Sequence, residues 1–338
     1  MIPFNWPSAV GKELDNIRTA LESGHLSGDG PFSKKCHEWM EQRWGGRALL
    51  THSCTGALEM ATILADVGYG DEVILPSYTF VSTANAVVLR GGVPVFVDVR
   101  ADTLNIDEAC IEAAITPKTK AIIAVHYAGV CAEMDSINAI AKRRGLVVIE
   151  DAAQAALSTY RGRPAGSLGQ LAAFSFHETK NLLSGEGGAL LVHDLALAER
   201  AEIIREKGTN RKLFFRGMTD KYTWVDVGSS YLPSELVAAF LWGQLEHAEE
   251  ITNYRIGVCQ NYRAAFSNLN KEGRVALPFV PEHCGFNGHM FYLMMQSVEE
   301  RSDFIAHMKA CGIATPFHYV PLHSSAFQGF NHIRLESG

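Results

Sequence analysis

One lysine in this sequence of 338 residues stands where an amine could do chemistry. In FSFHETKN, residues 174–181, an apolar strand end is followed by a short turn, by Lys180 and by the glycine-rich LLSGEGGA. A lysine amine that burial keeps partly neutral can act as a nucleophile or as a base. Most lysines are solvated surface groups, so a catalytic interpretation of Lys180 requires further evidence from other segments of the sequence.

Two further segments place polar residues where a helix should begin or a strand should end. In THSCTGALEM, Ser53, Thr55 and Gly56 precede a helix, whose free backbone N–H groups can bind a phosphate. A plain helix cap explains the same residues. In VVIEDAAQ, Glu150 and Asp151 end an apolar strand, where a buried carboxylate needs a cation or a hydrogen-bond donor. Capping of the following segment is the alternative.

Taken together, these segments supply what pyridoxal phosphate needs. The cofactor requires an anchor for its phosphate, a carboxylate that keeps its ring nitrogen protonated, and an amine that forms a Schiff base. PSYTFVSTANA, residues 76–86, adds Phe80, which could stack on the ring or belong to the core. The sequence therefore predicts a site for this cofactor.

The alternation of strands and helices predicts how these residues are positioned. Apolar stretches predict strands at 73–76, 93–99, 120–127, 146–152, 171–176 and 189–193. Helical spacing appears at 57–68, 106–115 and 134–145. This pattern is typical of an α/β doubly wound fold with a mostly parallel central sheet, which binds ligands at the carboxyl ends of its strands.

The remainder of the chain predicts a second, smaller unit. A long amphipathic helix is expected to start after Pro233, and we expect a large domain at 1–232 and a small α+β domain at 233–338. Within the small domain, 289–298 predicts a strand and 301–312 predicts a helix.

Composition argues against several functional classes. The chain has 30 basic and 37 acidic residues, a formal charge of −7 and no block of like charge, so nucleic acid is not expected as a partner. No run of eighteen apolar residues and no signal peptide is found, which predicts a soluble cytoplasmic protein without a membrane partner. No metal site is expected, because the seven cysteines form no CxxC pair and HETKN lacks the second histidine of HExxH.

Seven short segments, in this order, resemble the sugar-nucleotide aminotransferases of the DegT type, within fold type I of the pyridoxal phosphate enzymes. They are TGALEM, PSYTFVSTANA, VDV, HYAG, EDAAQ, FSFHETKN and GEGGAL, and the likeness runs from Ile2 to about His323. GDGPFSKKC, REKGTNR, KYTWVDVGSSYLPSEL and FHYVPLH are similar to one subgroup, which forms dTDP-4-amino-4,6-dideoxy-D-galactose for enterobacterial common antigen. That likeness implies amino transfer from L-glutamate to C4 of dTDP-4-dehydro-6-deoxy-D-glucose.

The resemblance also implies a role for individual residues. Lys180 would form the Schiff base and move the proton, Asp151 would pair with the ring nitrogen, and Gln154 would contact the phenolic oxygen. Phe80 would stack on the ring, and the phosphate would be held by Thr55, Gly56 and Ser175. The family implies a homodimer with sites at the subunit interface. In most members an asparagine contacts the cofactor phosphate of the neighbouring subunit. Ser230 stands at that position here, so the resemblance does not decide whether this chain makes the contact.

Residues for the sugar nucleotide are less clearly marked. Arg211 in GTNR, with Lys212 and Arg216 nearby, offers positive charge for a diphosphate, although a solvated basic loop explains the same pattern. His318, Tyr319 and His323 in FHYVPLH could reach a phosphate or a sugar hydroxyl, or they could be structural.

Family members continue for several tens of residues beyond FHYVPLH, whereas this sequence ends with SSAFQGFNHIRLESG. We therefore expect a lower melting temperature than that of a full-length relative, and equal melting in thermal unfolding would show that the tail is dispensable. Two alternatives stay open. One is an aminotransferase for another nucleotide-linked keto sugar, and the other is a truncated, non-catalytic protein that binds pyridoxal phosphate. Related dehydratases carry histidine in place of the lysine, and Lys180 argues against that class.

Overall fold

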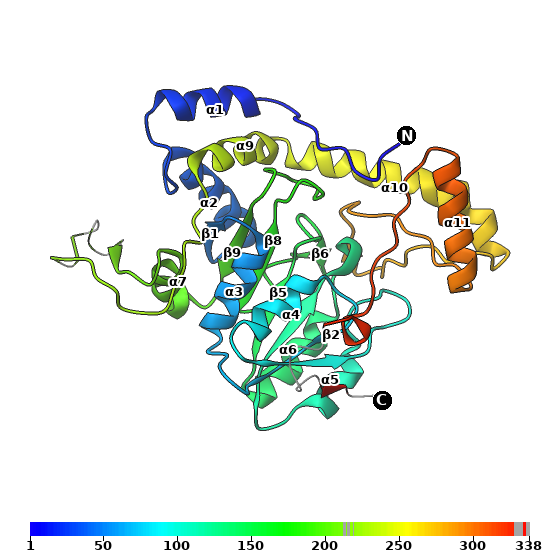
Figure 1. The fold of residues 1–338 in the computed structure, drawn as a ribbon, viewed down its shortest axis with the longest axis horizontal. Helices are drawn as coiled ribbons and strands as arrows, with labels where there is room; N and C mark the ends of the chain where they lie inside the picture. The colour runs from blue at the N-terminus through cyan, green and yellow to red at the C-terminus, as the bar shows by residue number, and fades with distance from the viewer. Residues whose placement is uncertain (212–213, 215–216, 219, 328–333, 336–338) are drawn as a thin grey trace.

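A mixed β-sheet forms the centre of the molecule (Figure 1). The computed structural model describes the chain except for residues 212–213, 215–216, 219, 328–333 and 336–338. Within the described part the sheet has eight strands, in the spatial order β1 (Arg47–Thr51), β9 (Gly188–Val192), β8 (Leu171–Ser175), β5 (Val147–Asp151), β4 (Thr119–Val125), β2 (Glu72–Pro76), β3 (Val93–Val97) and β11 (Arg334–Leu335). β9 runs antiparallel to both of its neighbours, and the other pairs are parallel.

The predicted α/β fold and all six predicted strands of the large sheet are confirmed. Helices cover both faces of the sheet, and the strands β1, β2, β3, β4, β5, β8 and β9 alternate between the two cores: Val148 of β5 faces one and Ile149 the other. This explains why the strands are apolar along their whole length. One core is closed by α2 (Pro31–Trp44), α5 (Glu108–Ala114), α6 (Met134–Arg144) and α9 (Glu235–Glu246), and the other by α3 (Cys54–Leu64), α4 (Val81–Val88) and α7 (Ala198–Arg205).

The long helix expected after Pro233 is interrupted. It consists of α9 and α10 (Ala248–Lys271), which meet at His247, where φ is −111° and ψ is 16°. α1 (Glu13–Glu22) packs against α9, and α10 extends toward α11 (Val298–Ala310), the predicted helix (Figure 1). Short 3-10 turns lie at η1 (Tyr127–Gly129), η2 (Leu195–Leu197) and η3 (Leu322–Ser324).

The strand predicted at 289–298 is wrong. Within the described residues this segment pairs only through a single bridge between Met294 and Ala276, and its last residue, Val298, already begins α11. A small sheet forms elsewhere, from β10 (Cys284–Gly285), β6 (Thr159–Tyr160) and β7 (Arg163–Pro164). The reason for the difference is that the side chains of 289–296 line a cavity instead of facing a second strand.

One close contact fixes the start of α3 against β9. A Cβ atom on Gly188 would lie 2.4 Å from the backbone nitrogen of Cys54 and from the carbonyl carbon of Ser53, so only glycine fits there. This contact holds the first turn of α3 beside the loop that carries Lys180. Among the described residues, no helix is long and apolar enough to span a membrane.

Candidate active site

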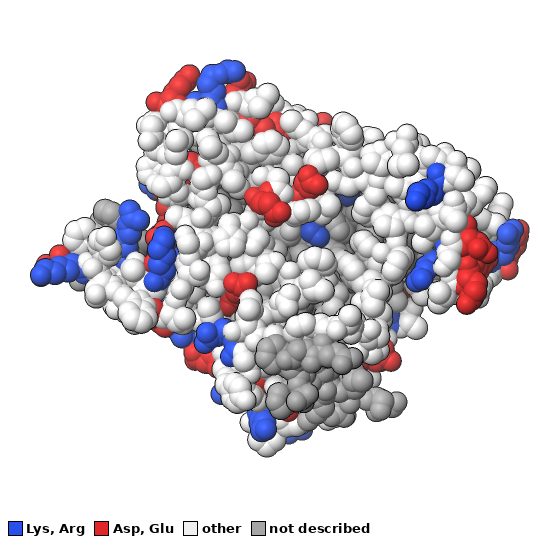
Figure 2. Space-filling model, viewed as in Figure 1, with Lys and Arg blue, Asp and Glu red and all other residues white. Residues whose placement is uncertain are grey.

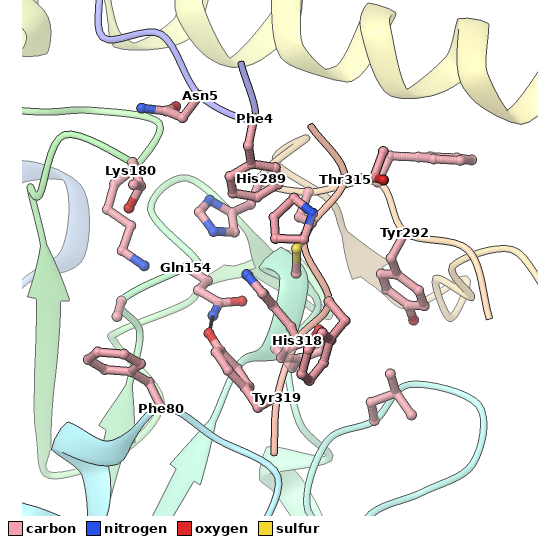
Figure 3. Close-up of a pocket in the computed structure, with 18 of the residues that line it drawn as sticks. Phe4, Asn5, Phe80, Gln154, Lys180, His289, Tyr292, Thr315, His318 and Tyr319 are labelled. Atoms are coloured by element: carbon pink, nitrogen blue, oxygen red, sulfur yellow. Dashed lines mark hydrogen bonds between the residues drawn. The ribbon is translucent and has the colours of Figure 1, made fainter. Parts of the chain in front are cut away.

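A cavity of about 1550 Å³ lies at the carboxyl ends of the central strands. Its wall includes the ends of β4, β5 and β8, the starts of α3 and α4, and three further segments at 2–6, 288–298 and 313–319. Figure 2 shows a hollow in this face, bordered mostly by uncharged side chains. Figure 3 shows how Lys180, Gln154, Phe80, His289, His318 and Tyr319 surround the space. Because parallel strands present their carboxyl ends at one edge, the predicted location of the site is also the observed location of the cavity.

Lys180 lines this cavity from the loop after β8. Its backbone N–H donates to the carbonyl oxygen of His177 at 2.9 Å, which closes the turn expected from HETKN. Burial lowers the pKa of the Lys180 amine, although the nearby Cys54 and Asp151 act in the opposite direction. More of the amine is therefore neutral at neutral pH than in a surface lysine, and a neutral amine is the form that acts as nucleophile or base.

Glu150 and Asp151 are adjacent at the end of β5 and point to opposite faces of the sheet, so they have different surroundings and different roles. Glu150 is fully buried and accepts hydrogen bonds from the backbone N–H groups of Gly166, Leu168 and Gly169, at 2.8, 2.6 and 2.6 Å. Its carboxylate also lies 2.8 Å from Nε2 of His126. Burial acts to raise the pKa of Glu150, but these partners outweigh it and lower that pKa. Glu150 therefore anchors a loop.

Asp151 faces the cavity. Its Oδ2 accepts a hydrogen bond from the hydroxyl of Thr83 at 2.8 Å, and its Oδ1 accepts one from the backbone N–H of Ala153 at 3.2 Å. Burial nevertheless raises the pKa of Asp151, against the opposing effects of Thr83, Ala153 and the positive charge of Lys180. A buried carboxylate of this kind is stabilised by any cation brought into contact with it.

The start of α3 is capped by one residue and leaves a second facing the cavity. The hydroxyl oxygen of Ser53 accepts the backbone N–H of Gly56 at 3.1 Å, so Ser53 is a helix cap. Thr55 lines the cavity, and its hydroxyl lies 2.8 Å from that of Ser82. Ser175, at the end of β8, also lines the cavity. These hydroxyls, with the free N–H groups of the first helical turn, form a seat for an anion.

Gln154 and Tyr319 form a pair in the wall of the cavity. Gln154 donates from Nε2 to the Tyr319 hydroxyl at 3.2 Å, and its Oε1 accepts the backbone N–H of Ala128 at 2.6 Å (Figure 3). Phe80 is 56% exposed at the start of α4, with its ring centre 6.3 Å from that of Tyr319. Phe80 is thus a cavity residue, free on one side to stack against a ligand.

The model of the DegT/DnrJ/EryC1/StrS aminotransferase family matches residues 7–332. The chain belongs to this family. It is 35% identical, over 95% of its length and 84% of the relative's, to the spore coat polysaccharide biosynthesis protein SpsC of Bacillus subtilis (strain 168). The structure of DesV of S. venezuelae with a ketimine intermediate is 32% identical, with a TM-score of 0.84 over 93% of this chain and 81% of that one.

The putative sugar aminotransferase Spr1654 of Streptococcus pneumoniae is also similar, in its PMP form, with 27% identity and a TM-score of 0.89 over 96% of this chain and 87% of that one. Its PLP form matches comparably. This DegT-family member is thus a transaminase that depends on pyridoxal phosphate, and its residues fit that cofactor. The buried carboxylate of Asp151 lacks a cation in contact among the described residues, and a protonated pyridine nitrogen is such a cation.

Some predicted site residues lie outside the cavity of their own chain. Ser230 is exposed, and its backbone forms an isolated antiparallel β-bridge with Glu206. The side chain of Arg211 forms an ion pair with Glu206 at 3.8 Å. Nδ1 of His323 lies 2.9 Å from the hydroxyl of Ser77. Gly56 is buried with its N–H already bonded to Ser53, and Lys212 and Arg216 fall outside the described residues. The roles predicted for all of these residues stay predictions.

The site also contains residues that sequence reasoning missed. Thr83 lies in VSTANA and follows Phe80 by one helical turn on the same side of α4, a spacing that could have indicated its place in the site. His289 lines the cavity, and its Nδ1 lies 2.9 Å from Oδ1 of Asn181, the residue after Lys180. Burial lowers the pKa of His289 well below its usual value, and the positive charges of Lys180, Arg255 and His318 act in the same direction. His289 is therefore a neutral imidazole at neutral pH.

Replacing Thr83 with valine should weaken cofactor binding, because Asp151 loses the hydroxyl that donates to it at 2.8 Å. A hydrogen bond to a charged group contributes about 1.5–3 kcal/mol, so we expect a dissociation constant for pyridoxal phosphate ~10- to 100-fold higher. The constant can be measured by quenching of intrinsic fluorescence. Thr83→Ser keeps the hydroxyl and should bind like the native protein. Equal binding by the valine variant would show that Thr83 only fills space.

Proposed function

We propose that this aminotransferase moves the amino group of L-glutamate to C4 of dTDP-4-dehydro-6-deoxy-D-glucose and forms dTDP-4-amino-4,6-dideoxy-D-galactose. The observation that carries the reaction class is the meeting of Lys180, with its lowered pKa, and the buried Asp151 in one cavity. The choice of this particular sugar as the substrate is based on the resemblance of the segments GDGPFSKKC, REKGTNR and FHYVPLH to one subgroup of the family. A product destined for cell-envelope polysaccharide, such as enterobacterial common antigen, is part of the proposal, and the B. subtilis relative named for spore coat polysaccharide supports it.

The residues of the cavity can divide the work. Asp151 would hold the ring nitrogen, Gln154 the phenolic oxygen, Phe80 one ring face, and Thr55 and Ser175 the phosphate. When bound, pyridoxal phosphate supplies an electron sink for the charge that develops when a proton leaves carbon. Lys180 removes the proton from Cα of the amino donor in the first half-reaction and delivers a proton to C4 of the sugar in the second. Its lowered pKa suits both directions, because the amine must be neutral in one step and protonated in the next.

A homodimer is part of this proposal. The described residues of the segment 209–230 lie on a projection at the left of Figure 1, and among them Trp224, Met218 and Tyr222 are 76%, 67% and 56% exposed. Large apolar side chains on a projecting segment are stabilised by burial against a second subunit. Such an arrangement would bring Ser230 and Arg211 of this segment toward the partner's cavity, where their predicted roles could be fulfilled. A cytoplasmic location completes the proposal, because glutamate and nucleotide-linked sugars are water-soluble metabolites.

The test is an absorbance spectrum of the purified protein with pyridoxal phosphate, recorded before and after addition of glutamate. The keto sugar is then added to the same sample. We expect a visible band that bleaches with glutamate and returns with dTDP-4-dehydro-6-deoxy-D-glucose, and NMR of the product should show an axial amine at C4. Return of the band only with a differently linked keto sugar would support the alternative substrate. A band that never bleaches would favour a protein that binds the cofactor without catalysis.

A further inference from the structure

Asn287 is a buried side chain that joins the wall of the cavity to the loop after β5. It has no exposed surface, and the two residues that follow it, Gly288 and His289, line the cavity. Its Nδ2 donates hydrogen bonds to the carbonyl oxygens of Gln154 and Ala156, at 2.9 Å each, and its Oδ1 accepts the backbone N–H of His289 at 3.0 Å. Both N–H groups and the oxygen of this amide have partners, which gives the side chain a single orientation. Asn287 thus ties His289 to the loop that carries Gln154.

The same segment holds Asn181, the residue after Lys180. Nδ2 of Asn181 donates to the backbone carbonyl oxygen of Asn287 at 2.8 Å, and its Oδ1 lies 2.9 Å from Nδ1 of His289. Because burial lowers the pKa of His289, its imidazole is neutral and carries one proton on the two ring nitrogens. A carboxamide oxygen only accepts, so Nδ1 carries that proton and donates the hydrogen bond to Asn181. The loop after β8 is therefore fixed one residue away from the catalytic lysine.

On its other side the segment is fixed to α10. Gly288 has a φ of 66°, and a Cβ atom there would lie 2.5 Å from the backbone nitrogen of Ile256, so only glycine fits. Arg255 donates from Nε to the carbonyl oxygen of Gly288 at 3.2 Å, and from Nη2 to that of His289 at 2.8 Å. Residues 287–289 are thus held from two sides and form a rigid support for the loop that carries Lys180.

This support matters because the side chain of Lys180 is a long, flexible stem, so the place of its amine depends on a fixed backbone. Proton transfer requires hydrogen-bond distances, and a misplacement of about 1 Å can lower a rate ~100-fold. Lys180 and Gln154 come from different loops but face the same space, together with His289 (Figure 3). Asn287 is bonded to both loops, through Asn181 on one side and through Gln154 on the other.

We propose that Asn181 and His289, anchored on Asn287, are positioning residues that hold the backbone of Lys180 in register with Gln154. This inference rests on the roles that the proposed function gives to Lys180 and Gln154. His289 acts through the N–H group that it donates to Asn181, and not as an acid or base toward the substrate. A carboxamide N–H can replace that group, whereas it cannot replace an imidazole that exchanges protons with a substrate. The two kinds of role can therefore be separated by substitution.

The test compares His289→Asn with His289→Leu in the full chain. Asparagine keeps an N–H donor close to the place of the imidazole Nδ1, and leucine has nearly the shape of asparagine without the donor. The first readout is the rate at which the visible band forms when the cofactor-free protein is mixed with pyridoxal phosphate. This step needs the Lys180 amine but neither glutamate nor the sugar. The second readout is the glutamate half-reaction of the loaded protein, measured over a range of glutamate concentrations.

We expect His289→Leu to lower the rate of band formation and the maximum rate of the glutamate half-reaction by ~10- to 100-fold. The glutamate concentration that gives half of the maximum rate should hardly change, because the lysine is misplaced and the donor site is not. His289→Asn should react at nearly the native rates. His307→Leu is the matched control, because His307 is an exposed histidine of α11 outside the cavity.

Asn181→Ala breaks the same link from its other end, and it replaces His289→Leu in the comparison if the leucine variant does not fold. It should slow both reactions by a similar factor. The double variant Asn181→Ala, His289→Leu should be no slower than Asn181→Ala alone, because the effects of two residues in one network do not add.

Three results would overturn the inference. Native rates in His289→Leu or in Asn181→Ala would show that the link does not position Lys180. Equal slowing by His289→Asn and His289→Leu would give the imidazole a direct role at the substrate or cofactor. Additive losses in the double variant would show that Asn181 and His289 act separately. A native protein whose band forms but is not bleached by glutamate would contradict the proposed function, and the rates of band formation would still decide the positioning role.

Discussion

Lys180→Ala is expected to abolish transamination, with a loss of at least ~10⁴-fold in the rate of the glutamate half-reaction, because one amine serves as covalent attachment point and as base. His289 also lines the cavity, but it cannot take over both roles, because an imidazole forms no Schiff base and its Nδ1 is held 2.9 Å from Oδ1 of Asn181. The measurement is single-turnover bleaching of the cofactor absorbance by glutamate. Turnover retained in the alanine variant would remove Lys180 from the mechanism.

The same substitution should leave the fold intact. A lysine whose pKa is lowered in the folded state makes the protein less stable at every pH below the unfolded value near 10.5, because protonation is favoured in the unfolded chain. Removing the amine should therefore keep or slightly raise the melting temperature of the cofactor-free protein at neutral pH. Lys180→Arg is the matched control, because it keeps a buried positive charge but has no titratable amine. It should also be inactive, and its melting temperature should not rise as that of Lys180→Ala does.

The local rules of sequence reading explain most of the sheet. Strands such as β5 are recognisable because both of their faces are buried, and the turn before Lys180 follows from the residues that form it. Period-two alternation implies that Glu150 and Asp151 face opposite ways, but not which of them faces the ligand. That choice depends on partners far away in the chain: Glu150 is held by Gly166 and its neighbours, and Asp151 by Thr83, 68 residues earlier.

The failures of prediction have the same origin. Residues 289–298 are rich in methionine and aromatic side chains, as strands often are, but a strand also needs a neighbour, and no local pattern specifies one. The break at His247 occurs without proline or glycine, so helical spacing alone extends through it. The N-terminal residues 2–6 reach the cavity because Ile2 pairs with Ile313, a contact between two distant segments. Functional residues brought in by such contacts are visible only in the fold.

Asp151→Asn should reduce transamination by ~100- to 1000-fold, because the buried negative charge that favours a protonated ring nitrogen is lost while the shape of the side chain is kept. The change removes an electrostatic interaction rather than a contact, since asparagine can still accept a hydrogen bond from Thr83 or Ala153. The glutamate half-reaction measures the loss. An active asparagine variant would mean that the ring nitrogen is not paired with residue 151.

Although Asp151→Asn should lower the activity, it should raise the free energy of unfolding of the cofactor-free protein at neutral pH. The pKa of Asp151 is raised above its ordinary value of 3.8 by burial, so its contribution to stability is present below that value and is lost as the pH rises through the folded-state pKa. Asp151→Asn cannot ionise and should escape this loss. Urea unfolding at a series of pH values should therefore show equal stability near pH 3 and a growing advantage of the variant above about pH 4.

Saturation with pyridoxal phosphate should reverse the order at neutral pH, because only the native carboxylate gains an ion pair with the ring. A variant that is less stable than the native protein without cofactor at neutral pH would show that Asp151 is held for the fold rather than for the ligand.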